Sequence, residues 1–158
     1  MPDVQVSAAQ PNPPGRDTIR PGLATNSKLN EEWVELLAIS KRNMVGDVLA
    51  NQTYDHQCRV TSTQTVCKFP SIELDAGDRL RVHTGSGSAG WVGRTYHYYL
   101  GRSWFVWNNA CGDCASLWYN DQRIDFARYD PRPPEGVLVR IAGTNLLQPQ
   151  PAFARSLW

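Results

Sequence analysis

The sequence predicts an all-β protein, and three stretches of the chain carry this prediction. Residues 79–84, RLRVHT, alternate polar and apolar side chains with a period of two, as a half-buried strand does. The residues before them, DAGD at 75–78, are turn formers. Two apolar runs at 104–107 and 115–119 flank a polar turn, a pattern typical of consecutive strands. We therefore expect strands and turns from residue 45 to about residue 130.

Length and composition limit the class of protein. A chain of 158 residues with 41% hydrophobic residues suits one β-sandwich domain of about 100 residues plus tails. The net charge of +1 argues against wholesale neutralisation of nucleic-acid phosphates. No apolar run approaches the ~20 residues that span a bilayer, and the first residues, MPDVQVSAAQ, do not resemble a secretory signal. We expect a soluble protein made in the cytoplasm, and incorporation into a virion or extracellular particle is compatible with this.

The two ends of the chain are expected to be extended. Five prolines in residues 1–27 block helices, so this segment is predicted to be either a disordered tail or an arm that docks on a partner. The run PRPPEG at 131–136 marks the end of the sandwich, and a strand is predicted at 136–142. The tail after it carries the apolar side chains of Phe153, Leu157 and Trp158. The predicted organisation is an arm (1–27), a sandwich (28–131) and a C-terminal strand with a docking tail (132–158).

Residues 28–40 fit two structures. Leu29, Trp33, Leu36 and Leu37 lie at helical spacing, which favours an amphipathic helix. The alternative is a first strand at 30–36. A second strand is predicted at 46–49, followed by a hairpin between about residues 55 and 69.

Two segments resemble the lamin-tail domain, especially its bacterial and phage forms: FPSIELDAGDRLRVHTGSG at 69–87 and VWNNACGDCASL at 106–117. The resemblance covers about residues 29–130. It implies an immunoglobulin-like β-sandwich, a strand at 30–36, and a non-catalytic module. Within these segments we expect Trp107 and Leu117 to fill the core, while Asn108 and Asn109, which tolerate left-handed geometry, bond their own backbone.

The four cysteines depart from this family pattern and leave several alternatives open. Cys111 and Cys114 form a CxxC pair, but a β-turn without a following helix disfavours redox catalysis. A zinc site would use Cys58, Cys67, Cys111 and Cys114 together, and free structural thiols are a further alternative. We favour disulfides, with Cys58 facing Cys67 across the predicted hairpin. No cofactor is expected, structural zinc being the alternative.

Residues 91–107 hold seven of the sixteen aromatic side chains, interleaved with arginine and histidine. One interpretation is a stacking surface for carbohydrate or single-stranded nucleic acid, with the candidate binding residues Trp91, Arg94, Tyr96, Tyr98 and Arg102. The favoured alternative places Tyr99, Trp104, Phe105 and Trp107 in the core. His83 is expected on the solvent face of its strand, together with Arg79 and Arg81.

These observations favour a non-catalytic structural or interaction module. We expect it to decorate or attach to a larger protein assembly, such as a virion or a cell surface, through its sandwich and its terminal arms. Phe153 and Trp158 are candidate docking residues in the C-terminal tail. The expected partner is a protein or protein assembly, with self-association included. Carbohydrate or nucleic acid, bound by residues 91–107, is the alternative.

Overall fold

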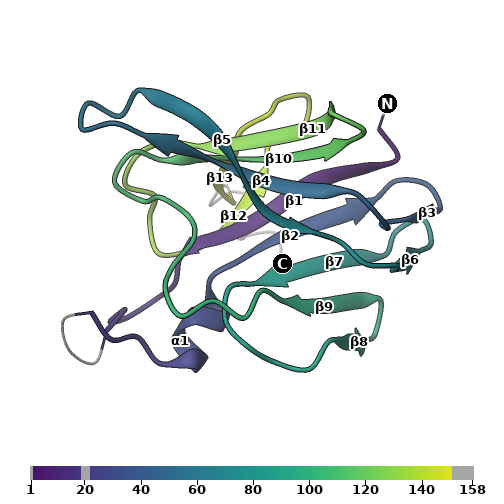
Figure 1. Cartoon of the computed structure of the whole chain (residues 1–158), viewed down its shortest axis with the longest axis horizontal. Coiled ribbons are helices and arrows are strands. Elements are labelled where there is room, and N and C mark those ends of the chain that lie inside the picture. Colours follow the sequence, from purple (N-terminus) through teal and green to yellow (C-terminus); the bar gives the residue numbers. More distant parts are fainter. Residues whose placement is uncertain (1, 19–21, 151–158) are drawn as a thin grey trace.

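Two packed β-sheets make up the fold in the computed structural model, which describes residues 2–18 and 22–150 (Figure 1). The larger sheet has the strand order β13 (Leu147–Pro149), β12 (Gly136–Arg140), β1 (Val4–Asn12), β2 (Trp33–Ala38), β7 (Arg79–His83), β9 (Thr95–Tyr99) and β8 (Gly90–Val92). The smaller sheet has the order β11 (Gln122–Tyr129), β10 (Asp113–Tyr119), β4 (Val48–Tyr54) and β5 (Val60–Lys68). The predicted all-β sandwich is confirmed.

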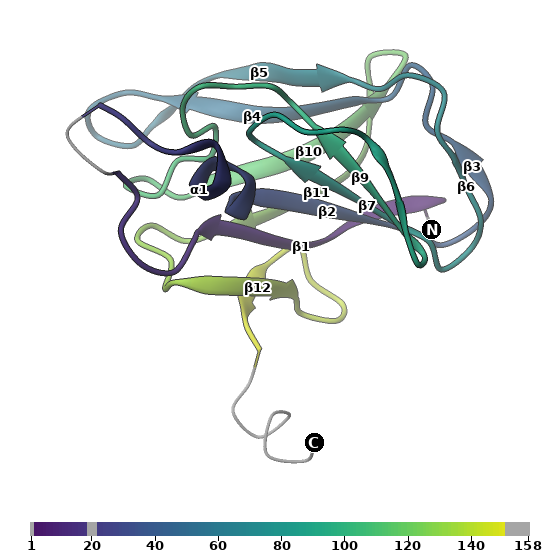
Figure 2. The same cartoon turned by 90° about the horizontal axis from the view of Figure 1, so that it is seen from below.

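Short elements close the two ends of the sandwich. The helix α1 (Asn26–Glu31) lies at one end, and the two-stranded ribbon of β3 (Arg42–Asn43) and β6 (Glu73–Leu74) lies at the other (Figures 1 and 2). The paired strands run antiparallel, apart from β7 and β9, which are parallel. No helix of the described chain is long and apolar enough to cross a membrane.

The core lies between the sheets and is filled by alternate residues of their strands. In β7, for example, Leu80 and Val82 are buried against it, as the period-two pattern predicts. Trp107 and Leu117 are 4% and 0% exposed, so their expected place in the core is confirmed. The other large core side chains include Val4, Val6, Val34, Leu36, Leu49, Val66, Phe69, Leu74 and Leu138.

The segment expected to be an N-terminal arm contributes a central strand instead. Strand β1 pairs with β12 on one side and β2 on the other, and its Val4 and Val6 are fully buried. Its prolines fall at the end of the strand, where Pro11, Pro13 and Pro14 stop the pairing. The boundaries predicted at residues 28 and 131 therefore do not delimit the sandwich, which runs from β1 to β13.

The ambiguous residues 28–40 adopt both predicted structures in succession. Thr25 caps α1, since its hydroxyl accepts a hydrogen bond from the Lys28 N–H. The helix buries Leu29 and ends before β2, whose expected start at residue 30 is three residues too early. Helical spacing thus arose from a short helix joined directly to a strand.

Two expected strands differ from those observed. Residues 104–107 form no strand, because hydrogen bonds outside a sheet ladder hold their backbone: the Val106 N–H donates to the Glu32 carboxylate at 2.8 Å. Val45 and Gly46 form a turn that the Asp47 N–H closes by donating to the Met44 carbonyl, and β4 begins at Val48. The expected hairpin exists, but its strands are β4 and β5 and its turn is at residues 55–59. The predicted strand at 136–142 is β12, which ends at Arg140.

Candidate functional site

A cleft of about 1020 Å³ crosses the outer face of the seven-stranded sheet. Its floor is formed by β1, β2 and β7, and one wall is formed by β12 and the loop that follows it. Strand alternation places these side chains outward, because their neighbours in sequence point into the core. The polar residues that argue for recognition are Gln5, Ser7, Gln10, Glu35, Arg79 and Arg81.

Two arginines of the cleft share one buried carboxylate. Glu35 lies opposite Arg81 in the β2–β7 ladder, and its side chain is only 5% exposed. Arg79 donates from Nη1 to Glu35 Oε2 at 3.0 Å, while Arg81 donates from Nε and Nη2 to Oε1 at 3.2 and 3.0 Å. One negative charge thus faces two positive charges, and the group carries a net charge of +1 at neutral pH.

The Arg81 guanidinium is also held by an aromatic ring. It lies over the Trp33 indole, 4.0 Å from the ring centroid, in the geometry of a cation–π interaction. Trp33 is 6% exposed, so the arginine covers the ring. The side chains of Arg79 and Arg81 remain 44% and 32% exposed. Both guanidinium groups are therefore oriented by the protein and accessible from the cleft.

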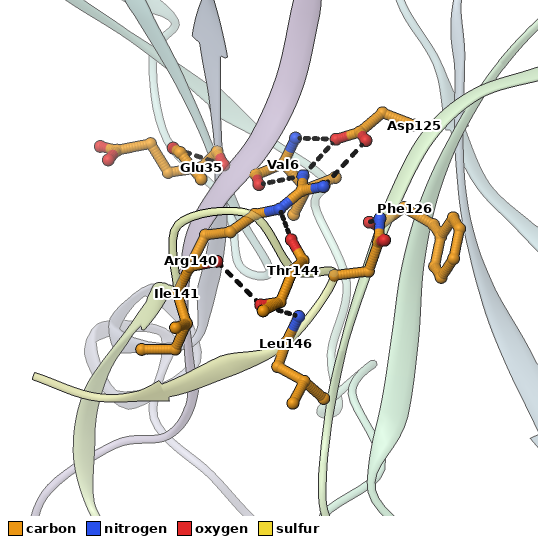
Figure 3. Close-up of polar contacts among 10 residues, drawn as sticks. Val6, Glu35, Asp125, Phe126, Arg140, Ile141, Thr144 and Leu146 are labelled. Atoms are coloured by element: carbon orange, nitrogen blue, oxygen red, sulfur yellow. Dashed lines mark hydrogen bonds and ion pairs between the residues drawn. The ribbon is translucent and has the colours of Figure 1, made fainter.

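A cluster around Arg140 fixes the wall of the cleft that β12 and the following loop form (Figure 3). Arg140 donates to both carboxylate oxygens of Asp125, at 2.6 and 3.2 Å, and to the carbonyls of Val6 and Thr144 at 3.0 and 2.8 Å. Asp125 also accepts the Val6 N–H at 2.8 Å. Because Asp125 belongs to the smaller sheet, this pair joins the two sheets. Its groups are engaged with one another, so we assign Arg140 a structural role.

The wall cluster lies where β1 is irregular. The β1–β2 register shifts between Val6 and Ala8, which leaves Ser7 as an extra residue. Its hydroxyl donates to the Glu35 carbonyl at 3.2 Å. Ser7 therefore lines the cleft. The backbone N–H of Val6 donates to Asp125, and its carbonyl accepts from Arg140 (Figure 3).

His83 is 8% exposed, which contradicts its expected solvent position. It does share a face with Arg79 and Arg81, but the Tyr99 ring stacks on it with centroids 4.8 Å apart. Its Nδ1 is 2.8 Å from the Asn30 carbonyl, and its Nε2 is 2.8 Å from His97 Nδ1. Since a carbonyl only accepts, His83 Nδ1 carries the proton and His97 donates to His83 Nε2. Burial lowers the pKa of both histidines, so the pair is neutral at pH 7.

The predicted aromatic surface is not continuous. Trp91 is 47% exposed, and Tyr96 packs against its edge with ring centroids 5.3 Å apart. Tyr96 and Tyr98 themselves are half-buried against the core, and Tyr98 contacts Phe69. Trp104 is 46% exposed, so its expected core position is wrong. Of the four residues expected in the core, Trp107 is buried, while Tyr99 and Phe105 are half-buried.

The two arginines of that segment make structural contacts. Arg94 binds Asp78 at 2.9 Å and also donates to the Ala76 carbonyl. Arg102 donates to the Val66 carbonyl at 3.0 Å. The candidate docking residues Phe153 and Trp158 lie outside the described residues.

The cysteines pair differently from the favoured prediction. Cys58, in the β4–β5 turn, forms a disulfide with Cys111, and their Cα atoms are 5.2 Å apart. Cys67 lies at the far end of β5, so the hairpin does not bring it opposite Cys58. Cys67 and Cys114 are free, and burial raises their thiol pKa values to about 12 and about 11. Neither thiol is therefore an effective nucleophile at neutral pH.

The four cysteines do not assemble a zinc site, because the disulfide uses two of them. In the described part of the chain, no group of three histidine, cysteine, aspartate or glutamate residues could hold a metal ion. Gly112 explains the local geometry of the CxxC segment. Its φ is +72°, and a Cβ there would collide with the backbone of residues 129–131.

The turn that precedes the CxxC pair is built partly as expected. Asn108 accepts the Cys111 N–H on its side-chain oxygen at 2.9 Å, which is the local bond expected of such a residue. Neither Asn108 nor Asn109 has a positive φ, so the turn does not use the left-handed geometry that asparagine tolerates. The buried Asp113 carboxylate orders the turn instead, accepting the Asn108, Cys114 and Gln52 N–H groups.

Sequence reasoning did not identify the cleft. Arg79 and Arg81 were expected only as solvent-facing residues, and Glu35 carried no expectation of its own. Two features of the sequence could have indicated it. Arg79 and Arg81 are two residues apart in one strand and so share a face, and Glu35 is the acidic residue of another strand. Which strands are neighbours depends on the topology, and the adjacency of β2 and β7 joins these residues.

Comparisons with known proteins do not identify the chain. No family model matches it, and a search of curated proteins found no match. The resemblance to the lamin-tail domain thus stays a prediction, as does the immunoglobulin-like identity of the sandwich.

Proposed function

We propose that this protein is a non-catalytic interaction module that attaches to a larger protein assembly, and that the cleft on its larger sheet is the recognition surface. The observation that carries the proposal is the pair of accessible guanidinium groups of Arg79 and Arg81, oriented by the buried Glu35. A virion or a cell surface is the setting we propose. Because β1 is a central strand, attachment uses the sandwich surface rather than a free N-terminal arm.

The cleft suits an acidic segment of a partner protein. The three donor contacts to Glu35 leave further N–H groups on both guanidinium forks, which match carboxylate geometry. The net charge of +1 on the group of Glu35, Arg79 and Arg81 adds long-range attraction for an anionic chain. Gln5, Ser7 and Gln10 offer amide and hydroxyl groups along the floor for a bound backbone.

A non-catalytic role is supported by the state of the reactive side chains. The disulfide occupies Cys58 and Cys111, and the raised thiol pKa values of Cys67 and Cys114 keep both protonated at neutral pH. The acidic side chains of the cleft region, Glu35 and Asp125, are already bound by arginines.

Binding of acidic peptides tests this proposal. The probe is a fluorescein-labelled ten-residue peptide with two glutamates, together with the same peptide carrying glutamines. We expect the acidic peptide to bind in low salt. Arg79→Gln should lower the affinity for this peptide by about tenfold, which is the effect of losing one charge-assisted hydrogen bond. Arg79 is preferred for mutation because Arg81 still neutralises Glu35 in the variant.

The matched control is Arg128→Gln, which removes an exposed arginine from the other sheet. It should leave peptide binding unchanged. Equal binding of the acidic and glutamine peptides, or an equal loss in both variants, would contradict the proposal.

A further inference from the structure

Strand β5 is an open edge of the smaller sheet. It is nine residues long, and no other described strand lies beyond it. Residues 60–65 are all exposed, with Val60 at 54%. At Val66 the edge is closed, because Arg102 reaches over and binds its carbonyl. Residues 60–65 therefore form a free segment long enough to pair with another strand.

The other three edges of the two main sheets are protected, each in its own way. Strand β8 is only three residues long. Strand β13 ends in proline, at Pro149. Strand β11 carries Arg123, Asp125 and Arg128, and the chain at Leu146 bridges to it. Short strands, prolines, charges and covering segments all hinder pairing between molecules. In contrast, residues 60–65, VTSTQT, contain neither a charge nor a proline.

The sequence of this edge is complementary to itself. If two copies pair antiparallel about a two-fold axis at Thr63, Thr61 lies opposite Thr65 and Ser62 opposite Gln64. Each pair joins uncharged, hydrogen-bonding side chains, and Thr–Thr pairs stabilise antiparallel sheets. Arg59 and Lys68 lie outside the paired segment, so no like charges oppose each other within it.

An exposed aromatic side chain lies next to the same edge. Trp104 is 46% exposed and shares a shallow pocket with Gln64 and Thr65. A strand added at β5 would cover part of this indole, and burial of apolar area favours association.

We propose that two copies of this chain associate through β5, pairing antiparallel about Thr63 to form a continuous eight-stranded sheet. The occupant of the edge is a second copy, because the edge sequence pairs with itself without opposing charges. The pairing is small, so the dimer is weak, with a dissociation constant on the order of 10 μM. This contact is independent of the cleft, which lies on the outer face of the other sheet.

Charge substitution at the axis tests the pairing. Sedimentation velocity of the full chain, from about 1 to 200 μM, should show a concentration-dependent dimer. Thr63→Lys places two positive charges across the axis and should raise the dissociation constant by more than tenfold. Thr63→Glu should do the same with negative charges. An equimolar mixture of the two variants should form a heterodimer, because the charges then attract. Thr63 is exposed, so neither variant is expected to unfold, and circular dichroism checks this.

Gln122→Lys on the protected edge strand β11 is the matched control, and it should leave the dimer unchanged. Arg79→Gln should also leave it unchanged, which separates this inference from the proposed function. A monomer at all concentrations would overturn the inference. So would a dimer that persists in both Thr63 variants, or variants that dissociate and do not associate on mixing.

Discussion

At the scale of single residues, the buried acid Glu32 has the most consequential environment. It is fully buried at the junction of α1 and β2. Its Oε1 accepts hydrogen bonds from the Thr84 hydroxyl at 2.6 Å and the Val106 N–H at 2.8 Å. Its Oε2 has no hydrogen-bond partner among the described residues. Burial raises the pKa of this carboxyl to about 7, and hydrogen bonds to the carboxylate oppose the shift only in part.

The raised pKa of Glu32 predicts a pH-dependent stability. Between about pH 4.5 and 7 the unfolded chain loses the Glu32 proton while the folded chain keeps it, so this group lowers the free energy of unfolding as the pH rises. The full effect is about 3 kcal/mol. His83 and His97 act oppositely below pH 6.5, because their folded pKa values are lowered. The histidine contribution cancels when the wild type is compared with Glu32→Gln.

Urea unfolding of both proteins at pH 4.5, 6.0 and 7.5 measures the effect. We expect the stability of the wild type relative to Glu32→Gln to fall steadily across this range. A difference that is constant with pH would show that Glu32 has an ordinary pKa.

At the scale of elements, the disulfide joins the β4–β5 turn to the segment that precedes β10. Cys58 has a positive φ of 59° in a turn closed by Asp55, whose carboxylate accepts the Gln57 and Arg59 N–H groups. On the other side, Asp113 and Asn108 order the Cys111 segment. Two independently ordered turns are thus linked at the end of the sandwich.

Removing this disulfide should lower stability substantially. Its two cysteines are 53 residues apart, and the chain entropy of a loop of that length corresponds to about 4 kcal/mol. We expect Cys58→Ser/Cys111→Ser to unfold at a lower urea midpoint than the oxidised wild type, by up to that free energy. The wild type reduced with dithiothreitol should have the same urea midpoint as the double variant. Dithiothreitol should not change the midpoint of the double variant. Equal midpoints for oxidised wild type and double variant would contradict the prediction.

At the scale of the whole molecule, the first and last described strands lie in one sheet. Strand β1 lies between β12 and β2, so the larger sheet is completed only when residues 136–140 have been added beside residues 4–12 (Figure 2). The Arg140–Asp125 pair then ties this part of the larger sheet to the smaller one. Folding therefore depends on contacts between the two ends of the described chain.

Deleting residues 1–12 tests this dependence. The deletion removes the central strand with its buried Val4, Val6 and Ala9, and leaves both β2 and β12 without a partner on that side. We expect loss of the cooperative urea transition and of near-ultraviolet circular dichroism. A deleted protein that still unfolds cooperatively would restore the interpretation of these residues as an arm.

Much of this fold follows from local patterns. The alternation at residues 79–83, the turn at 75–78, the strand at 136–140 and the core positions of Trp107 and Leu117 could be predicted, because each depends on neighbours in sequence. Strand β1 also alternates, at Val4, Gln5 and Val6, but its prolines made an arm the preferred interpretation.

Three features were decided by tertiary structure, because each depends on which distant segments become neighbours. Cys58 pairs with Cys111 because the β4–β5 turn and the segment before β10 meet at one end of the sandwich. The cleft exists because β2 and β7 are adjacent, which brings Glu35 to Arg79 and Arg81. Strand β5 is an open edge only because the sheet ends there. Local sequence determined that this chain forms strands and turns, whereas the strand order decided which side chains could act together. The reason is that alternation along a strand sets the face on which a side chain lies, but it does not set which strand lies beside it.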